Sequence, residues 1–421
     1  MKFFIQTFGC QMNVYDGQRI ASLLESSGWT QTAEIPDADL IILNTCAVRE
    51  KASEKIFSML GKIAKEKKPA ARMGIVGCAA RAEGEKAFRR IKGLNFVLGP
   101  QSYHKIPEVL EQSKYMDIDL SGLEKFDALP ENTRSTAIAY IPVQEGCSHC
   151  CTYCVVPFTR GPEVSRDMDS VLREVKSAAE RGAREICFLG QNVNGYKPSL
   201  ADLIIEAAKI PSIKRIRYTS SYPTEMSDNL IQLHGTEEKL LPFVNMPLQS
   251  GSPRILRKMN RPDDLGQYIE IVEKFKRARP DIKISSDFIV GFPGETEEDF
   301  QMTMDMARKM GFINSYPFKY SPRPRTLAAA MPDQVPEGTK ARRLKELDNL
   351  LGENNREFNL SLVGRTLPCI IDEAGKIPNQ AIARTPWTGQ VVLDGGARFM
   401  GKLVDIKITG GNKSSLRGEI K

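Results

Sequence analysis

The sequence predicts an α/β protein of three domains: an N-terminal parallel-sheet α/β domain, a central partial (β/α) barrel and a small C-terminal β-barrel. Over two long stretches, short apolar strands alternate with helical segments, which is typical of parallel sheets. From about residue 361 the segments are short, alternating and broken by glycine pairs, which is typical of a small all-β domain. We therefore expect an N-terminal domain at 1–115, a linker at 116–136, the central domain at 137–360 and the β-barrel at 361–421.

Each of three predicted strands in the N-terminal domain ends beside a cysteine. The strands lie near 3–5, 40–43 and 73–76, with helical patterns at 17–27 and 54–66. Cys10, Cys46 and Cys78 follow the strands, and ligands of open parallel sheets gather at the edge where strands end. A single free cysteine is more often a buried core residue. Three in the same local context favour a three-cysteine metal site.

The central domain begins with a strand at 137–141 that leads directly into a cysteine-rich loop. An apolar stripe at helical spacing then predicts a helix from Met168 to Ala179, with Asp167 or Asp169 as its N-cap. Further strands are expected at 185–190, 215–218, 243–246 and 282–290. This is most of a (β/α) barrel, whose active site lies at the C-terminal ends of the strands, where the cysteine-rich loop falls.

Cys147, Cys151 and Cys154 in that loop have the spacing C-x3-C-x2-C, with Tyr153 just before the last. Three thiolates can hold a [4Fe–4S] cluster and leave one iron free to bind a small molecule. The additional Cys150 also allows two adjoining C-x2-C pairs, and so a four-thiolate zinc site. Zinc pairs are normally separated by a longer loop, so the iron–sulfur interpretation is favoured.

Composition indicates a globular protein, with 421 residues of which 41% are hydrophobic and 26% charged. The sequence shows no apolar run of membrane-spanning length and no signal peptide, so we expect a cytoplasmic protein that contacts no membrane. Nine cysteines then serve as thiols in a reducing compartment, and Cys187 and Cys369 are expected in the core. Residues 361–421 hold nine Lys and Arg against five Asp and Glu. A basic β-barrel is a plausible RNA-binding module, and a solvated structural face is the alternative.

The motifs together resemble the radical SAM methylthiotransferase family. The three cysteine motifs of its N-terminal domain, its cluster loop and three further barrel motifs match Gln6–Asn13, Leu43–Glu50, Val76–Cys78, Glu145–Arg166, Leu189–Asn194, Pro247–Ser252 and Asp287–Thr296. The C-terminal tail is similar to the TRAM domain, a small RNA-binding barrel. Within the family the chain looks most like the MiaB type, which makes 2-methylthio-N6-dimethylallyladenosine in tRNA.

The resemblance implies two [4Fe–4S] clusters and S-adenosyl-L-methionine as cofactors. Cys147, Cys151 and Cys154 would bind the cluster that cleaves S-adenosylmethionine to a radical, and would be the catalytic ligands. Cys10, Cys46 and Cys78 would bind an auxiliary cluster that carries the sulfur. The implied reaction converts N6-isopentenyladenosine at tRNA position 37, in the anticodon stem-loop, to its 2-methylthio form. Threonylcarbamoyladenosine in tRNA and a ribosomal protein are the alternative substrates. The electron donor and the sulfur donor are not indicated.

Five more residues carry weaker expectations, each beside a structural alternative. Tyr153 is expected near the adenine of S-adenosylmethionine, with core packing as the alternative. Gln191 and Asn192 follow a strand end and could bond polar groups of the cofactor or cap a loop. Arg160 and Arg166 flank the cluster loop and could meet RNA phosphate or the cofactor carboxylate, or form ordinary ion pairs.

The chain also departs from the family pattern at four positions. Tyr222 and Asn245 stand where histidines are usual, Pro162 replaces a basic residue and Arg325 replaces a glycine. None of the four is an expected cluster ligand. They affect the expected contacts with substrate.

Overall fold

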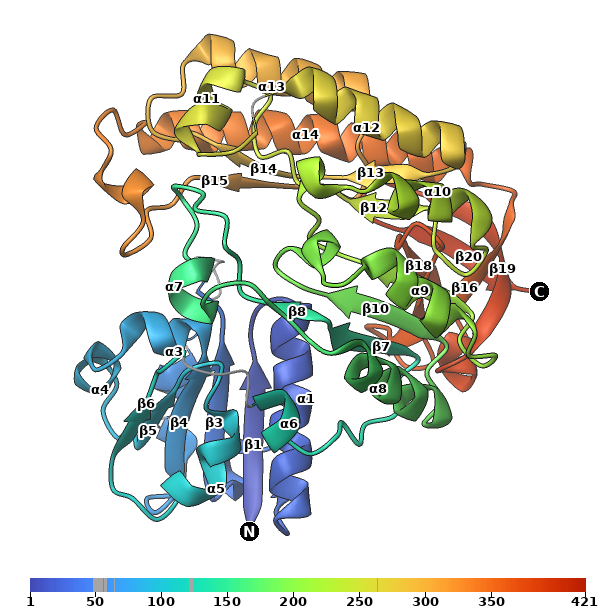
Figure 1. The fold of residues 1–421 in the computed structure, drawn as a ribbon. Coiled ribbons are helices and arrows are strands. Elements are labelled where there is room, and N and C mark those ends of the chain that lie inside the picture. The colour runs from blue at the N-terminus through green and yellow to red at the C-terminus, as the bar shows by residue number, and fades with distance from the viewer. Residues whose placement is uncertain (48–55, 57–58, 64, 121–124, 263) are drawn as a thin grey trace.

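The structure is a computed structural model that describes every residue except 48–55, 57–58, 64, 121–124 and 263. The end of the expected Cys46 motif, at 48–50, lies outside the described residues, as does part of the expected helix at 54–66. Three bodies are visible along the chain: a sheet with flanking helices, an open barrel with helices outside it, and a small closed β-barrel (Figure 1). Within the described ranges, no helix is both long and apolar enough to cross a membrane.

The N-terminal domain is a parallel sheet, as predicted. Its order is β2-β1-β3-β4-β5-β6, with bounds Thr30–Gln31, Lys2–Thr7, Leu40–Thr45, Arg72–Gly77, Phe96–Leu98 and Tyr115–Asp117. Every residue of β3 is buried, as expected for a central strand covered on both faces. The described helices are α1, α3, α4 and α5, at Gln11–Ser26, Cys78–Glu83, Lys86–Arg90 and Ile106–Val109. A short helix α6 (Lys125–Ala128) lies in the connection to the next domain.

The central domain is an open arc of parallel strands. These are β7, β10, β11, β12, β13, β14 and β15, at Ile138–Pro142, Glu185–Leu189, Arg215–Tyr218, Phe243–Asn245, Lys283–Ser285, Asp287–Val290 and Tyr316–Lys319. Helices outside the arc are α8, α9, α10, α12 and α13, at Met168–Glu180, Leu200–Ala208, Asp228–Thr236, Leu265–Ala278 and Glu297–Met310. The expected helix near 168–179 is confirmed, and Asp167 is its N-cap, accepting a hydrogen bond from Ser170 N.

One predicted strand, at 282–290, is two strands in the structure. β13 pairs with β12 and β14 pairs with β15, and the chain changes partner at Ser286. There, side chains replace the ladder: Ser286 N donates to Ser315 Oγ (2.8 Å), and Leu248 N donates to Ser286 Oγ (2.9 Å). Two serine hydroxyls therefore satisfy backbone groups that a continuous strand would pair.

The C-terminal barrel is closed in the order β16-β17-β18-β20-β19, with bounds Thr366–Ala374, Ala381–Arg384, Gln390–Leu393, Leu416–Ile420 and Leu403–Gly411. The long helix α14 (Glu337–Ser361) leads into it. Arg215 of β11 joins the two domains by donating to the carbonyl oxygens of Arg384 (2.9 Å) and Thr385 (2.7 Å). The Trp387 indole donates to Asp281 O (2.9 Å). The barrel is thus docked on the central domain (Figure 1).

Two buried cysteines are core residues, as predicted. Cys187 in β10 and Cys369 in β16 have no exposed surface. Burial raises the pKa of Cys187 to about 11 and that of Cys369 to about 12. Both therefore remain neutral thiols at physiological pH.

A buried histidine in α10 makes the folding stability of the central domain sensitive to acid. His234 Nε2 lies 2.8 Å from the Tyr218 hydroxyl, and burial, with Arg279 nearby, lowers the pKa of His234 to about 3. Between pH 6.5 and 3 only the unfolded chain binds this proton, so stability is complete above pH 6.5 and falls as the pH decreases. We expect a loss of about 1.4 kcal/mol per pH unit in this window. Urea unfolding of the wild type and His234→Gln should show a flatter pH slope in the variant. Equal pH dependence of stability in the two proteins would contradict this role of His234.

Candidate active site

Cys10, Cys46 and Cys78 lie at one edge of the N-terminal sheet, as their strand positions predict. Cys10 precedes α1, Cys46 directly follows β3 and Cys78 is the first residue of α3. The strands before them, β1, β3 and β4, are neighbours in the sheet. Asn13 of α1 and Asn44 of β3 link the segments beside Cys10 and Cys46: Asn13 Nδ2 donates to Asn44 Oδ1 (3.0 Å), and Asn44 Nδ2 donates to Asn13 O (2.7 Å).

The electrostatics of this site favour a thiolate at one position. A hydrogen bond from Cys46, against the effect of burial and with help from Arg160, lowers the pKa of Cys10 to about 6. Burial raises the pKa of Cys78. The thiolate is the form that binds iron. Because each thiol must lose its proton to become a ligand, metal binding at this site releases protons.

The Cys147 loop is held in place by two glutamines, one in β8 and one just after β10. The loop begins after β8 (Gln144–Glu145), and the chain returns to pair with β8 as the short antiparallel strand β9 (Val164–Ser165). Gln191 Oε1 accepts from Gly146 N (2.6 Å), and Gln144 Oε1 accepts from the backbone N of Gln191 (2.9 Å) and Asn192 (3.0 Å). Burial raises the pKa of Cys147 to about 11 and that of Cys154 to about 12. Both thiols are thus protonated until a metal displaces the protons.

Gln191 and Asn192 therefore cap the loop, which is the structural alternative of the sequence analysis. The Asn192 amide donates to Glu163 Oε2 (3.0 Å) and Glu225 Oε2 (2.6 Å). Its Oδ1 is buried without a hydrogen-bond partner. The side-chain carbonyl oxygen of Gln191 already accepts the hydrogen bond from Gly146 N. Asn192 Oδ1 is therefore a buried acceptor that a ligand could use.

The opposite side of the loop contacts the short helix α11 (Pro253–Lys258) and the segment after β15. Thr152 N donates to Met259 O (3.0 Å), and Ala328 N donates to Thr152 O (2.9 Å). The Tyr153 ring packs against the apolar cluster of these segments, which includes Met259, Phe292 and Tyr320. Its packing agrees with the structural alternative, and its hydroxyl also hydrogen-bonds Cys151 of the cluster loop.

A stack of three side chains lies over the loop. The His149 and Tyr222 rings are parallel with centroids 3.7 Å apart, and the Arg261 guanidinium lies 4.6 Å from the centroid of Tyr222. Arg261 Nη1 is 4.0 Å from Cys151 Sγ, and His149 Nε2 is 2.8 Å from Glu225 Oε1. Tyr222, one of the four departures, thus carries a cation on one face and a cluster-loop residue on the other.

The other departures have structural explanations. Asn245 accepts from Ser220 N (3.1 Å) and donates to Ser285 Oγ (3.3 Å), so its amide bridges strand ends. The Pro162 carbonyl faces Gly146, whose φ is +78°. Arg325 is exposed and has φ +69°, a conformation that costs a non-glycine residue about 1 kcal/mol. The left-handed backbone conformation at position 325 therefore explains why glycine is usual there.

Arg160 and Arg166 are buried between domains, so neither presents its guanidinium to RNA. Arg166 Nη1 bonds Pro142 O (2.7 Å) and Glu174 Oε2 (2.8 Å), and Glu174 also meets Tyr15 of α1 (3.4 Å). Arg160 ends helix α7 (Val156–Arg160), which packs against α3. The prediction of a contact with RNA phosphate is not supported for either residue, because ion pairs at the domain interface occupy both.

Arg160 also bonds a cysteine of the other site. Its Nε donates to Cys78 Sγ (3.1 Å), its Nη2 to Asp16 Oδ2 (3.0 Å) and its Nη1 to Glu145. Asp16 and Glu145 were not expected in the site. Glu145 begins the matched motif that contains the Cys147 loop and Asp16 lies close to Cys10, but neither position identifies the partner of the charge.

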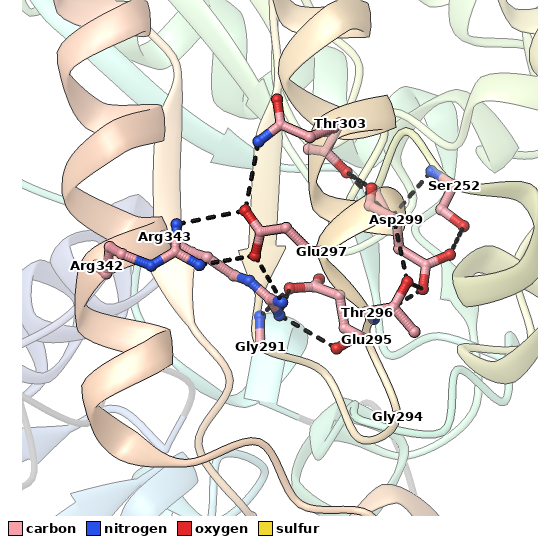
Figure 2. A network of polar contacts seen from close by, with 12 residues as sticks. Ser252, Gly291, Gly294, Glu295, Thr296, Glu297, Asp299, Thr303, Arg342 and Arg343 are labelled. Carbon is pink, nitrogen blue, oxygen red and sulfur yellow. Dashed lines mark hydrogen bonds and ion pairs between the residues drawn. The ribbon is translucent and has the colours of Figure 1, made fainter.

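Two of the matched motifs form the supporting loops shown in Figure 2. Ser252 Oγ donates to Asp299 Oδ1 (2.6 Å), and Arg254 pairs with the same carboxylate. Arg343 of α14 donates to Glu295 Oε1 (2.7 Å), which also accepts from Gly291 N (2.8 Å). The segments after β12 and β14 are therefore fastened to each other and to the helix that leads into the C-terminal barrel.

The donor sets suit iron–sulfur clusters, because thiolates are their usual ligands. Across the described part of the chain, no three His, Cys, Asp or Glu side chains are already grouped around one metal position. One cysteine set lies in a single loop, and the other lies at one edge of the N-terminal sheet. Cys150 is exposed, and its backbone oxygen accepts from Asn260 Nδ2 (3.0 Å).

Three family models match the chain in succession. They are described as an uncharacterized protein family, UPF0004, at residues 2–99, the radical SAM superfamily at 141–307, and the TRAM domain at 360–421. Among solved structures, the radical S-adenosylmethionine methyltransferase TsrM from Kitasatospora setae has TM-score 0.58 at 14% identity, covering 78% of this chain and 77% of that chain. The cobalamin-dependent radical enzyme OxsB has TM-score 0.53 at 11% identity, covering 84% and 56%. These structures show the shared fold.

Full-length relatives are much closer in sequence. A tRNA-2-methylthio-N(6)-dimethylallyladenosine synthase of Rickettsia canadensis (strain McKiel) is 46% identical over 441 residues, covering 100% of this chain and 99% of the relative. The protein of the same name from Zymomonas mobilis subsp. mobilis is 44% identical over 428 residues, covering 99% and 96%. The chain is a radical SAM enzyme, and it belongs to the family of tRNA-2-methylthio-N(6)-dimethylallyladenosine synthases.

Proposed function

We propose that this chain adds a methylthio group to C2 of N6-isopentenyladenosine at position 37 of tRNA, in the cytoplasm. The cofactors of the family are [4Fe–4S] clusters and S-adenosylmethionine, and its substrate is tRNA. We assign Cys147, Cys151 and Cys154 to the cluster that binds S-adenosylmethionine. Cys10, Cys46 and Cys78 are assigned to the auxiliary cluster. The domain limits 1–115, 137–360 and 361–421 belong to the same proposal, with 116–136 as the linker.

The observation that carries this assignment is the contact between α3 and α7. Helix α3 begins at Cys78, and α7 begins two residues after Cys154. Arg81 of α3 also donates to the Phe158 carbonyl oxygen of α7 (2.7 Å). Since Cys78 begins one of these helices and Cys154 lies two residues before the other, the two three-cysteine sets meet near this contact, and one substrate base can reach both. Methylthiolation requires such proximity, because sulfur held at one site must meet a carbon activated at the other.

The chain's own residues then have definite tasks. Once bound, the cofactors supply radical chemistry, which suits an aromatic C–H bond that has no acidic proton. Gln144 and Gln191 hold the backbone of the cluster loop, and Asn192 Oδ1 offers an unused acceptor beside it. The Tyr222 ring holds His149 and Arg261 in one stack above Cys151.

An anaerobic assay tests the proposed function. Cluster-reconstituted protein receives S-adenosylmethionine, a reductant, sulfide and tRNA bearing isopentenyladenosine, and the digested nucleosides are weighed. We expect a methylthio mass gain on isopentenyladenosine. Formation of 5′-deoxyadenosine without that gain would overturn the substrate assignment and favour threonylcarbamoyladenosine tRNA or a ribosomal protein.

We also propose a contact with tRNA phosphate at Arg81 and Arg325. Burial and the charge of Arg325 lower the pKa of Arg81, so the two cations, from different domains, are close enough to repel. An anion between them would relieve that repulsion. Phosphate is the anion that arginine recognises in RNA. Arg325 moreover keeps a long cationic side chain at a backbone position that favours glycine, and strain of this kind concentrates at functional sites.

The Arg325→Gly variant tests the contact with tRNA without an expected loss of folding stability. Glycine removes the backbone strain at φ +69°, so we expect no loss of thermal stability. Binding of tRNA should weaken severalfold, and the slope of log affinity against log salt should fall by about 1. The control is Arg308→Gln on α13, which removes an exposed arginine paired with Asp305. Equal tRNA affinity and salt slope in Arg325→Gly and wild type would contradict the proposed contact.

A further inference from the structure

The side chain that joins the two cysteine sites is Arg160, which lies at the meeting point of the two domains. Its guanidinium is 4% exposed, and it is the last residue of α7, six positions after Cys154. Nε donates to Cys78 Sγ at 3.1 Å. Nη2 and Nη1 donate to Asp16 of α1 and Glu145 of β8, respectively. All three of its nitrogens are therefore used, and two of the three partners belong to the N-terminal domain.

Two further polar side chains from the N-terminal domain complete the network. Gln101 Nε2 donates to Glu145 Oε2 (3.2 Å), and the Tyr103 hydroxyl donates to Asp16 Oδ2 (3.2 Å). Asp16 and Glu145 are 1% exposed. A buried, charge-assisted network of this kind is costly to disrupt and orders the groups it joins. It is therefore suited to hold α7 and Cys78 in one relative position.

We propose that Arg160 is a positioning residue that binds the auxiliary-cluster ligand Cys78 and couples it to the radical SAM loop. This inference rests on the proposed function, because it takes Cys78 as a cluster ligand. Hydrogen bonds and nearby charge at a ligand sulfur stabilise the more negative, reduced form of an iron–sulfur cluster. Arg160 thus raises the reduction potential of the auxiliary cluster and keeps that cluster at a fixed place beside the other one.

The matched control is Arg166. It is 7% exposed and lies at the same interface, where it pairs with Glu174 of its own domain, and Glu174 in turn contacts Tyr15 of α1. It bonds a backbone carbonyl and a carboxylate and lies over the Phe126 ring, and none of these contacts involves a cysteine. Arg166→Gln therefore removes an equally buried guanidinium without touching a sulfur. A loss that comes only from weakening the domain interface should appear in both variants.

The test uses the full chain with Cys147, Cys151 and Cys154 replaced by alanine, so that only the auxiliary cluster remains. About four irons per chain are expected in this background; no bound iron would overturn the ligand assignment itself. A redox titration followed by electron paramagnetic resonance then compares added Arg160→Gln with added Arg166→Gln. We expect a lower midpoint potential in the first alone. An unchanged potential, or the same shift in both, would overturn the role of Arg160.

A second variant covers the case in which Arg160→Gln does not fold. Arg160→Lys keeps the buried charge but presents a single ammonium in place of the planar fork of three nitrogens, so it does not reproduce the geometry that joins Cys78, Asp16 and Glu145. In the chain with all six cysteines, we expect Arg160→Lys to form 5′-deoxyadenosine normally and to yield less methylthio product for each one formed. A product ratio equal to that of the wild type would overturn the coupling.

Discussion

Replacing Cys151 by alanine is expected to abolish formation of 5′-deoxyadenosine, whereas replacing Cys46 should abolish only the methylthio product. Cys151 lies in the loop assigned to S-adenosylmethionine cleavage, and Cys46 lies at the edge of the N-terminal sheet. Loss of a residue that merely orients a metal ligand costs about 10–100-fold in activity. Loss of a ligand should therefore cost more than about 100-fold. Chromatography of 5′-deoxyadenosine and mass spectrometry of the nucleosides measure the two effects in one reaction.

Cys150→Ala is the matched control, because Cys150 lies in the same loop and is exposed. We expect it to retain both products and about eight irons per chain, as two [4Fe–4S] clusters require. If Cys150→Ala lost iron as Cys151→Ala does, the cluster loop would need four thiols, and the proposed ligand set would be wrong. Equal loss of 5′-deoxyadenosine in Cys46→Ala and Cys151→Ala would contradict the division into two sites.

Sequence patterns predicted the parts of the site that depend on local and sheet geometry. Cys10, Cys46 and Cys78 could be placed together because parallel strands that alternate with helices end at one edge. The long helix after Asp167 and the strand before the Cys147 loop followed from periodicity. Such predictions succeed because one element, or one sheet, determines where the residue lies.

The domain interface could not be predicted in the same way. Arg160 is close in sequence to Cys154, yet it bonds Cys78 and Asp16, which lie 82 and 144 positions away. Nothing in a periodic pattern states which faces of two domains will meet. The loop-capping role of Gln191 was equally hidden, because its partner Gly146 is 45 positions away in the same domain, just after β8. Long-range polar pairing depends on how the domains are docked, so it appears only in the folded structure.

The cluster loop also depends on one glycine, and Gly146→Ala is expected to remove the Cys147 cluster. Gly146 has φ +78°, and a Cβ there would overlap the carbonyl groups of Pro162 and Gly161. The hydrogen bond from Cys147 N to Gly161 O (3.2 Å) holds these two backbone segments together. The left-handed conformation alone costs a residue with a Cβ about 1–2 kcal/mol. The overlap adds to that cost, because it is with backbone and not with a side chain that could rotate away.

Iron content and product analysis separate the local effect of Gly146→Ala from general instability. We expect about four irons per chain in place of eight, with 5′-deoxyadenosine reduced more than about 100-fold. The control is Gly182→Ala, at φ +108°, where a Cβ would meet only Ser135 Oγ at 3.5 Å. It imposes comparable backbone strain in the loop after α8, away from both cysteine sets, and should lower stability while both clusters remain. If Gly146→Ala kept eight irons and full S-adenosylmethionine cleavage, the close approach of Pro162 to this loop would not be what shapes the cluster site.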